Sequence, residues 1–296
     1  MGRQATSGAA PAAVTGRAPR TARTRHIIPG FGLTLGITLT ALSLVVLIPL
    51  AAIVFTGAQM GPAKFLQVIT RPRMLSSFYV SFSTALVAST ANAVFGTILA
   101  WVLVRYRFPG RHVLDGMVEL PFALPTAVAG IALTALTTDE GWVGSVFAAR
   151  GIHLAYTRAG ITIALVFVGI PFVVRAVQPV LEKLDPSVEE AADVMGASRS
   201  LTFRRVILPE LMPALLSGFG LALSRCLGEY GSVVFIAGNM PFKTEIAPLV
   251  IMGDLEQFDY AGASAVAIVM LAVAFAILFA MSLVQARSAR ILRGGE

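Results

Sequence analysis

Charged residues are scarce in this chain of 296 residues, where Asp, Glu, Lys and Arg together make up 13% of the sequence. A soluble domain carries about a quarter charged residues, and the mean hydropathy here is +0.79, which argues against a water-soluble enzyme. A hydrophobic fraction of 56% also excludes disorder over most of the chain. The single cysteine, Cys226, excludes an intramolecular disulfide and a cysteine-rich metal site.

Signatures of catalysis are missing as well. The three histidines, His26, His112 and His153, lie far apart and form no helix-spaced metal pair. No lysine follows a glycine, so none occupies the lysine position of an ATP-binding Walker A loop. We therefore expect no cofactor, no metal and no enzymatic activity in this chain itself.

Long uncharged runs occupy most of the sequence. Each is close to or longer than the length of about 20 residues that a membrane-spanning helix needs. They lack the two-residue alternation of barrel strands. We predict an all-α integral membrane protein with six transmembrane helices, at about 31–55, 78–104, 117–138, 159–181, 211–232 and 261–285. Residues 27–290 would form this transmembrane domain. Residues 1–26 have almost nothing to bury and are expected to be a disordered basic tail.

The placement of Lys and Arg predicts the orientation, because basic residues concentrate in cytoplasmic connections. With the N-terminus inside, most of them fall in the tail, the second-to-third connection, the fourth-to-fifth connection and the C-terminal end. This predicts cytoplasmic termini. It also accounts for the formal net charge of +7 without nucleic acid, since the basic stretches carry few aromatic residues for base stacking.

The connection between the fourth and fifth spans contains a short amphipathic helix. Ser187 and Glu190 have capping-box spacing, Gly196 suits the left-handed end of a helix, and Ser198 can cap a second short helix. An apolar stripe follows the first helix: Val188, Ala191, Ala192 and Met195. So short a helix needs a surface to dock on. Two alternatives remain, a hairpin resting on the chain's own helices and a docking site for a cytoplasmic partner.

A longer pattern in this connection resembles the EAA loop of ABC importer permeases. Glu190-Ala191-Ala192 is followed after three residues by Gly196, and after nine more by Val206-Ile207-Leu208-Pro209; the family pattern has Ile where Val206 stands. The resemblance implies the type I importer permease (MetI-like) fold and a bacterial plasma (inner) membrane. It further implies that this loop is a coupling helix held in a cleft of an ATP-binding subunit. The coupling residues would be Glu190, Ala191, Ala192, Gly196, Val206, Leu208 and Pro209.

Other segments look like the permeases of sulfate/thiosulfate importers of the CysT type, and the match runs from about Ile28 to the C-terminus. They lie at 105–111, 120–130, 171–179, 228–231 and 235–239. The resemblance implies ATP-driven import of sulfate or thiosulfate by alternating access, in a complex that is a sulfate-transporting ATPase. Its implied partners are a homologous second permease (CysW-like), two ATP-binding subunits (CysA-like) that hold ATP and Mg, and a periplasmic or extracellular sulfate/thiosulfate-binding protein.

The residues of the anion path stay open at this stage. Arg225 lies deep in the fifth span and is a candidate cation; the alternative is an i, i+4 ion pair with Glu229 that only neutralises both. Pro121 and Pro125 break the start of the third span. The break either exposes backbone N–H groups to the path or makes a packing kink.

Glycines after Arg225 give the chain unusual freedom. Gly228 and Gly231, with Gly238, predict a bent or re-entrant segment that lines the outer part of the path. Asp115 and Glu119 lie four residues apart before the third span, and we expect them to be solvated end charges rather than a proton relay.

Two other functions fit parts of the sequence. The same machine can carry another oxyanion such as molybdate or tungstate, because all are tetrahedral dianions. An ion-coupled secondary anion transporter would need intramembrane carboxylates, and only Glu229 qualifies clearly. Competition among labelled anions, and uptake without an ATP-binding subunit, distinguish these functions.

Overall fold

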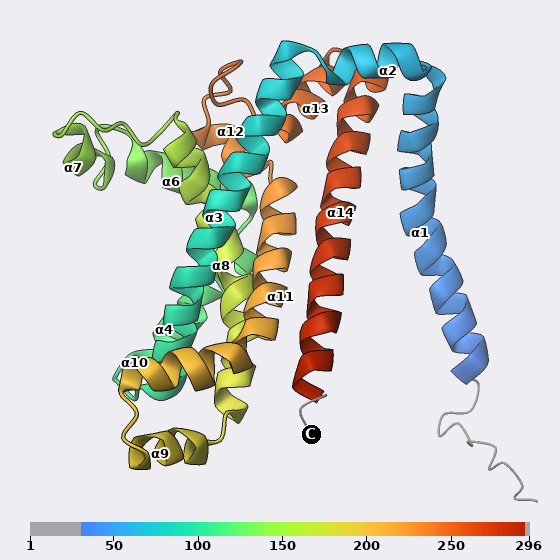
Figure 1. Cartoon of the computed structure of the whole chain (residues 1–296). Coiled ribbons are helices and arrows are strands. Elements are labelled where there is room, and N and C mark those ends of the chain that lie inside the picture. The colour runs from blue at the N-terminus through green and yellow to red at the C-terminus, as the bar shows by residue number, and fades with distance from the viewer. Residues whose placement is uncertain (1–30, 294–296) are drawn as a thin grey trace, which may run out of the picture. The chain divides into compact units, whose positions relative to one another are not determined.

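A computed structural model describes residues 31–293 of the chain, with side chains described as far as residue 285. The elements of this part are all helices (Figure 1). They are α1 Phe31–Gln59, α2 Pro62–Ile69, α3 Pro72–Arg105, α4 Arg111–Val118, α5 Leu120–Ala123, α6 Thr126–Thr137, α7 Gly144–Ala148, α8 Arg158–Lys183, α9 Pro186–Val194, α10 Arg199–Thr202, the π-helix η1 Phe203–Ile207, α11 Leu208–Leu227, α12 Val233–Ile236, α13 Ala247–Glu256 and α14 Tyr260–Arg293. The expected tail at 1–26 lies outside the described residues.

Five described helical segments are long and apolar enough to cross a membrane. They are α1, α3, α8, the segment Arg199–Leu227 and α14 as far as Gln285. The expected third span, 117–138, is not one continuous helix, because α5 ends at Ala123 and α6 begins at Thr126. Its longest piece, α6, has 12 residues, and at a rise of 1.5 Å per residue it falls short of a hydrocarbon layer of about 30 Å. The count of six spans therefore stays a prediction.

The chain divides into two compact units at Pro49. In the first unit, the described residues 31–49 form the beginning of α1, and all of them are exposed. A helix that is apolar on every side suits a lipid environment. The second unit, from Leu50, contains the remaining helices and the two buried clusters described below.

Helices α3, α8 and α11 pack against one another and form the centre of the second unit. Their close approach depends on two glycines that face the fully buried Val173 of α8. A Cβ on Gly96 of α3 would lie 3.0 Å from the Val173 side chain, and one on Gly218 of α11 would lie 2.9 Å from the Val173 Cα. Small residues permit such close crossings between transmembrane helices. Helix α14 packs on α11 and α13.

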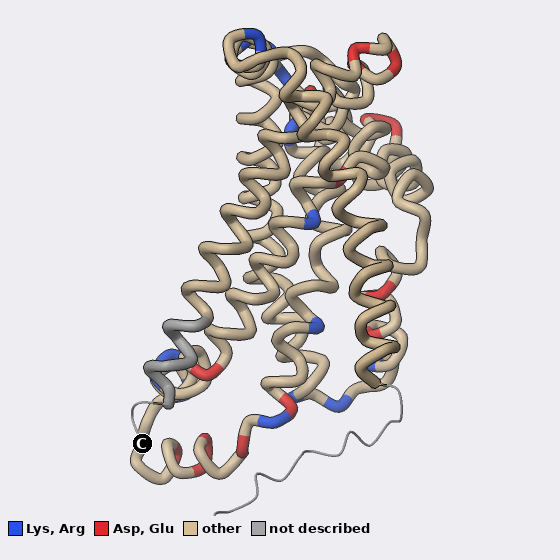
Figure 2. The backbone as a smooth tube through the Cα atoms, turned by 90° about the vertical axis from the view of Figure 1, so that its right-hand side faces the viewer, with Lys and Arg blue, Asp and Glu red and all other residues tan. Residues whose placement is uncertain are grey.

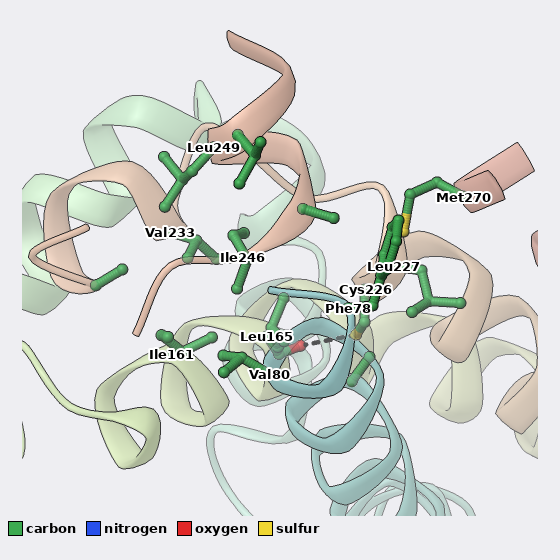
Figure 3. Packing of buried hydrophobic residues seen from close by; sticks show 14 of the residues in the cluster. Phe78, Val80, Ile161, Leu165, Cys226, Leu227, Val233, Ile246, Leu249 and Met270 are labelled. Atoms are coloured by element: carbon green, nitrogen blue, oxygen red, sulfur yellow. Dashed lines mark hydrogen bonds between the residues drawn. The ribbon is translucent and has the colours of Figure 1, made fainter. Parts of the chain in front are cut away.

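Buried apolar side chains form two clusters in this unit. One joins α3, α8 and α11 to α12 and α13, and Figure 3 shows its packing around the hydrogen bond from Cys226 Sγ to the Leu165 carbonyl oxygen, 3.4 Å long. The other lies near the start of α9 and includes Leu103, Leu181 and Ile207. Acidic and basic residues gather toward the two ends of the helices (Figure 2).

The connections of the second unit lie at two opposite ends. Helices α9 and α10 lie at the end opposite to α12 and α13 (Figure 1). At the α9 end, Arg105 of α3 forms an ion pair with Glu189 of α9, which joins two connections expected on the inner side. At the other end, the Arg158 Nε donates to the Lys243 carbonyl oxygen over 2.9 Å, which joins two connections expected outside.

Candidate functional site

Helix α9 begins two residues earlier than the sequence predicted. Asp185 is its N-cap, and a side-chain oxygen of Asp185 accepts a hydrogen bond of 2.9 Å from the Ser187 backbone N–H. Pro186 occupies the first helical position, where its missing N–H costs nothing. The predicted capping box of Ser187 and Glu190 is therefore wrong. The bond from Ser187 also holds the pKa of Asp185 below its ordinary value of 3.8.

The predicted end of this helix is confirmed. Gly196 has φ of 76°, the left-handed conformation that a side chain disfavours. The next predicted cap is confirmed too, because Ser198 Oγ accepts from the Leu201 N–H over 3.4 Å. From there α10 continues through η1 into α11. A π-helix such as η1 is rare and occurs mainly as a single turn inserted in an α-helix.

Helix α9 displays most of its apolar stripe instead of burying it. Ala192 is 4% exposed, whereas Val188 is 43%, Val194 is 88% and Met195 is 80% exposed. Ala191 is exposed as well. The alternative of a hairpin resting on the chain's own helices requires this stripe to be covered, and among the described residues only Ala192 is. We call the four exposed apolar residues Val188, Ala191, Val194 and Met195 the α9 surface.

The predicted coupling residues fall into two groups. Glu190, Ala191, Ala192 and Gly196 lie on α9 or at its end, and Glu190 is exposed. The others lie at the junction of η1 and α11, where Val206 and Leu208 are half-buried and Pro209 is exposed. The loop is thus anchored at this junction, through the buried Ile207, and presents α9 outward.

Arg225 and Glu229 form the i, i+4 ion pair that the sequence left as one alternative. The Glu229 side chain is 2% exposed, and its Oε1 also accepts from the Ser232 backbone N–H at 2.8 Å and from the Ser232 Oγ at 2.9 Å. The Arg225 side chain, by contrast, is 35% exposed. The carboxylate is therefore fully held by the chain, while the guanidinium keeps an accessible side.

The structure brings two candidate parts of the anion path together. Helix α6 begins at Thr126 after Pro125, without a side-chain cap, so its first N–H groups have no partner within the helix. A Cβ on Gly231 would lie 2.1 Å from the Thr126 Oγ1, and one on Gly130 would lie 2.6 Å from the Ser232 carbonyl oxygen. The broken start of the third span thus touches the turn that follows Glu229.

The segment after α11 is irregular, as the glycines predicted. Helix α11 ends at Leu227 and is followed only by the short α12 before the next loop. Left-handed backbone occurs at Gly238, with φ of 69°, whereas Gly228 has φ of −91°. Pro121 lies apart from this turn, within α5.

Sequence reasoning missed the role of Arg175 in α8. Its Nη1 donates to Asp115 Oδ1 over 2.8 Å and to Gln178 Oε1 over 2.7 Å, and its Nη2 lies 2.7 Å from Glu119 Oε1. Asp115 is 35% and Glu119 is 58% exposed, so both stay in contact with solvent as expected, but each also has an ion-pair partner that the sequence did not indicate. Their spacing of four residues, which puts both on one helix face, was the available signal.

Comparison with known proteins identifies the family. Residues 92–292 match the family model described as binding-protein-dependent transport system inner membrane component. The sulfate transport system permease proteins CysT of Salmonella typhimurium and Escherichia coli are each 48% identical to this chain over 270 residues, which cover 91% of this chain and 98% of theirs. The chain belongs to the CysT family of transport permeases. It is accordingly a multi-pass membrane component of an ABC importer and not itself a catalytic enzyme.

Solved structures agree on the fold of this CysT-family chain. A chain of a bacterial alginate ABC transporter, in complex with an alginate pentasaccharide-bound periplasmic protein, superposes with a TM-score of 0.70 at 17% identity and covers 87% of this chain and 95% of its own. A chain of the MetNI methionine ABC transporter in an inward-facing conformation gives a TM-score of 0.55 at 17% identity, over 73% of this chain and 96% of its own. At these identities the likeness shows the importer permease fold alone.

Proposed function

We propose that this chain is the permease subunit through which an ATP-driven importer moves sulfate or thiosulfate into the cytoplasm. The observation that carries the proposal is the 48% identity to sulfate permeases over 91% of this chain. That similarity spans both the α9 loop and the turn after α11. A tetrahedral dianion needs a positive charge along its path, and the partly exposed Arg225 would supply one. The carboxylate partner of Arg225, Glu229, also accepts a hydrogen bond from Ser232.

The ATP-binding subunit would dock on the α9 surface. Apolar side chains exposed on a short helix favour a protein partner, and the exposed Glu190 would lie at the edge of that contact. Two such subunits (CysA-like) would bind ATP and Mg, because this sequence has no Walker A loop of its own. Each would engage one permease, this chain or a homologous second permease (CysW-like).

In this proposal the α9 end faces the cytoplasm of a bacterial inner membrane, with both termini on that side. The basic residues of the connections at this end support that orientation. A binding protein would then deliver sulfate or thiosulfate to the end that carries α12 and α13. Closure of the ATP-binding subunits would move α9 and rock the helices between inward-open and outward-open states. Nucleotide shifts that balance only through different affinities for the two states.

For the anion path we propose the region where α6 begins and α11 ends. Arg225 supplies a positive charge, and the uncapped N-terminus of α6 behind Pro125 supplies N–H donors. Glu229, Gly228 and Gly231 shape the turn between them. Pro125 separates α6 from α5, and Pro121 would act one step away, at the start of α5.

Uptake by membrane vesicles that contain the assembled importer tests the proposal. Labelled sulfate should accumulate only with ATP and the ATP-binding subunit, and unlabelled thiosulfate should compete more strongly than molybdate. Stronger competition by molybdate would assign the other oxyanion. Accumulation without the ATP-binding subunit would favour an ion-coupled transporter instead.

Co-purification tests the docking surface separately. Gly196→Trp places a side chain on a backbone with φ of 76°, which distorts the end of α9 although nothing lies within 4 Å of the new Cβ. We expect the ATP-binding subunit to be lost from the purified complex. Gly116→Trp is the control, because Gly116 also has open space around its Cβ and has no positive φ. An undiminished complex with Gly196→Trp would contradict docking on α9.

A further inference from the structure

We propose that Arg105 and Glu189 are positioning residues that transmit the movement of α9 to α3, as a second mechanical route beside the covalent chain. This inference rests on the proposed function, in which α9 carries the motion of the ATP-binding subunit. The covalent route reaches only α8, which precedes α9, and α11, which follows it. Helix α3 belongs to the same three-helix centre but has no covalent link to this loop.

The contact itself is a chain of three interactions on the last turn of α3. Arg105 Nη2 donates to Glu189 Oε1 of α9. The Arg105 Cζ lies over the Trp101 ring, 5.5 Å from its centroid. Trp101 in turn meets Phe203 edge to face, with ring centroids 5.7 Å apart and planes at 78°. The four residues Glu189, Arg105, Trp101 and Phe203 are called the α3 clamp below.

The α3 clamp contacts the segment from α9 to η1 at both of its ends. Glu189 lies in the first turn of α9, and Phe203 is the first residue of η1, where the chain returns toward α11. Both ends therefore meet one turn of α3, residues 101–105. A displacement of α9 relative to the bundle must either carry this turn along or break the ion pair.

Burial makes the ion pair more than a loose surface contact. The Arg105 side chain is 22% exposed and that of Glu189 is 31% exposed. The Arg105 Nε is buried and has no hydrogen-bond partner among the described residues. Because water does not fully solvate this guanidinium, loss of Glu189 leaves a partly desolvated charge without its counter-ion. Arg105 also ends α3, where a positive charge favours the helix dipole.

The neighbouring side chains show that the pairing is specific. Glu190 is one residue further along α9 and is exposed without an ion pair among the described residues. Arg107, two residues beyond Arg105, is likewise exposed and unpaired there. Glu189 is thus the acid of α9 that turns inward, while Glu190 remains available to the partner.

The test compares coupling in the complete importer, reconstituted with its ATP-binding subunits in lipid vesicles. Arg105→Gln should leave the ATP-binding subunits bound and ATP hydrolysis nearly unchanged, while labelled sulfate uptake falls by about fivefold, the scale of interaction between contacting residues. Fewer anions would thus enter per ATP. Arg107→Gln is the matched control and should change neither rate. The exchanged pair Arg105→Glu with Glu189→Arg should recover most of the uptake.

Two outcomes would overturn the α3 clamp. Uptake per ATP that is unchanged in Arg105→Gln would show that α3 needs no second route. If Arg105→Gln prevents assembly, Glu189→Gln keeps the side-chain shape and removes only the charge; loss of assembly there too would make the pair a folding contact. Failure of the proposed function itself is distinguishable, because the unmodified complex would then lack ATP-dependent sulfate uptake.

Discussion

Among individual residues, Glu229 is a tightly constrained acid. It is buried, forms an ion pair with Arg225, and accepts hydrogen bonds from the Ser232 N–H and the Ser232 Oγ. Arg225 is less enclosed. Removing one member of the pair therefore has a different effect from removing the other. Removing Arg225 leaves a buried charge, whereas neutralising Glu229 leaves a partly solvated one.

This inequality predicts the order of stability of two variants. Arg225→Met should lower the stability by about 1–3 kcal/mol, because a buried carboxylate loses its counter-ion. Glu229→Gln should cost less, since its amide oxygen still accepts from Ser232 and Arg225 remains partly in contact with solvent. Thermal unfolding of the purified complex measures both. Equal melting temperatures for the two variants would contradict this account, and Arg225→Lys, which keeps the charge, serves as the control.

A second prediction at this scale concerns Gly231. Gly231→Ala should destabilise the fold by about 1–3 kcal/mol, because its Cβ would lie 2.1 Å from the Thr126 Oγ1. Gly228→Ala is the matched control, with nothing nearer than the Ser224 carbonyl oxygen at 3.9 Å. Adding Thr126→Ala should recover part of the loss, because it removes Oγ1 but leaves the Thr126 Cβ position 3.0 Å away, and the same melting experiment checks all three. No recovery in the double variant would mean that another contact governs this turn.

Among the elements, α9 depends on its ends because it has few contacts of its own. A helix of 9 residues is too short to be stable in isolation. Asp185, Gly196 and Ser198 set where it starts, where it ends and how the chain leaves it. The α9 surface can remain exposed because these local interactions, with the Glu189 ion pair, fix the helix in place of packing.

We therefore predict that Asp185→Ala loosens α9 while Ser187→Ala does not, because Asp185 supplies the capping oxygen. Hydrogen exchange of the α9 amides should quicken in the first variant only, and Asp185→Asn should behave as the unmodified protein. The pKa of Asp185 is lowered on folding, so its contribution is complete above pH 3.8 and is lost as the pH falls through the lower folded value. Equal exchange in Asp185→Ala and Ser187→Ala would refute the assignment.

At the scale of the whole molecule, the two ends of the bundle must face different compartments. The single cysteine, Cys226, is 3% exposed and should not react with a maleimide in the folded protein. A cysteine replacing Ser200 in α10 and one replacing Ser145 in α7 then report on opposite ends, because both serines are exposed. We expect a membrane-impermeant maleimide to label position 145 in intact cells and position 200 only in inverted vesicles. The reverse pattern would invert the proposed orientation.

Local features of this molecule could be predicted from sequence, and contacts between distant segments could not. Gly196 and Ser198 act on residues next to them in the chain, so their roles could be predicted from the sequence. Asp185 was missed although Asp followed by Pro is a recognisable helix start. The pairing of Arg105 with Glu189 spans 84 residues and that of Arg175 with Asp115 spans 60. Such partners depend on how α3, α4, α8 and α9 pack, which no local pattern contains.

The π-helix η1 has a consequence for the direction in which α9 points. A π turn holds one residue more than an α turn, and one residue of an α-helix corresponds to a rotation of about 100°. The surplus residue within Phe203–Ile207 therefore sets the angular phase between α11 and everything on its N-terminal side. Deleting it would let the segment relax into ordinary α geometry and swing α9 around the α11 axis, away from Arg105. The direction in which α9 points thus depends on one inserted residue in the turn that leads to α11.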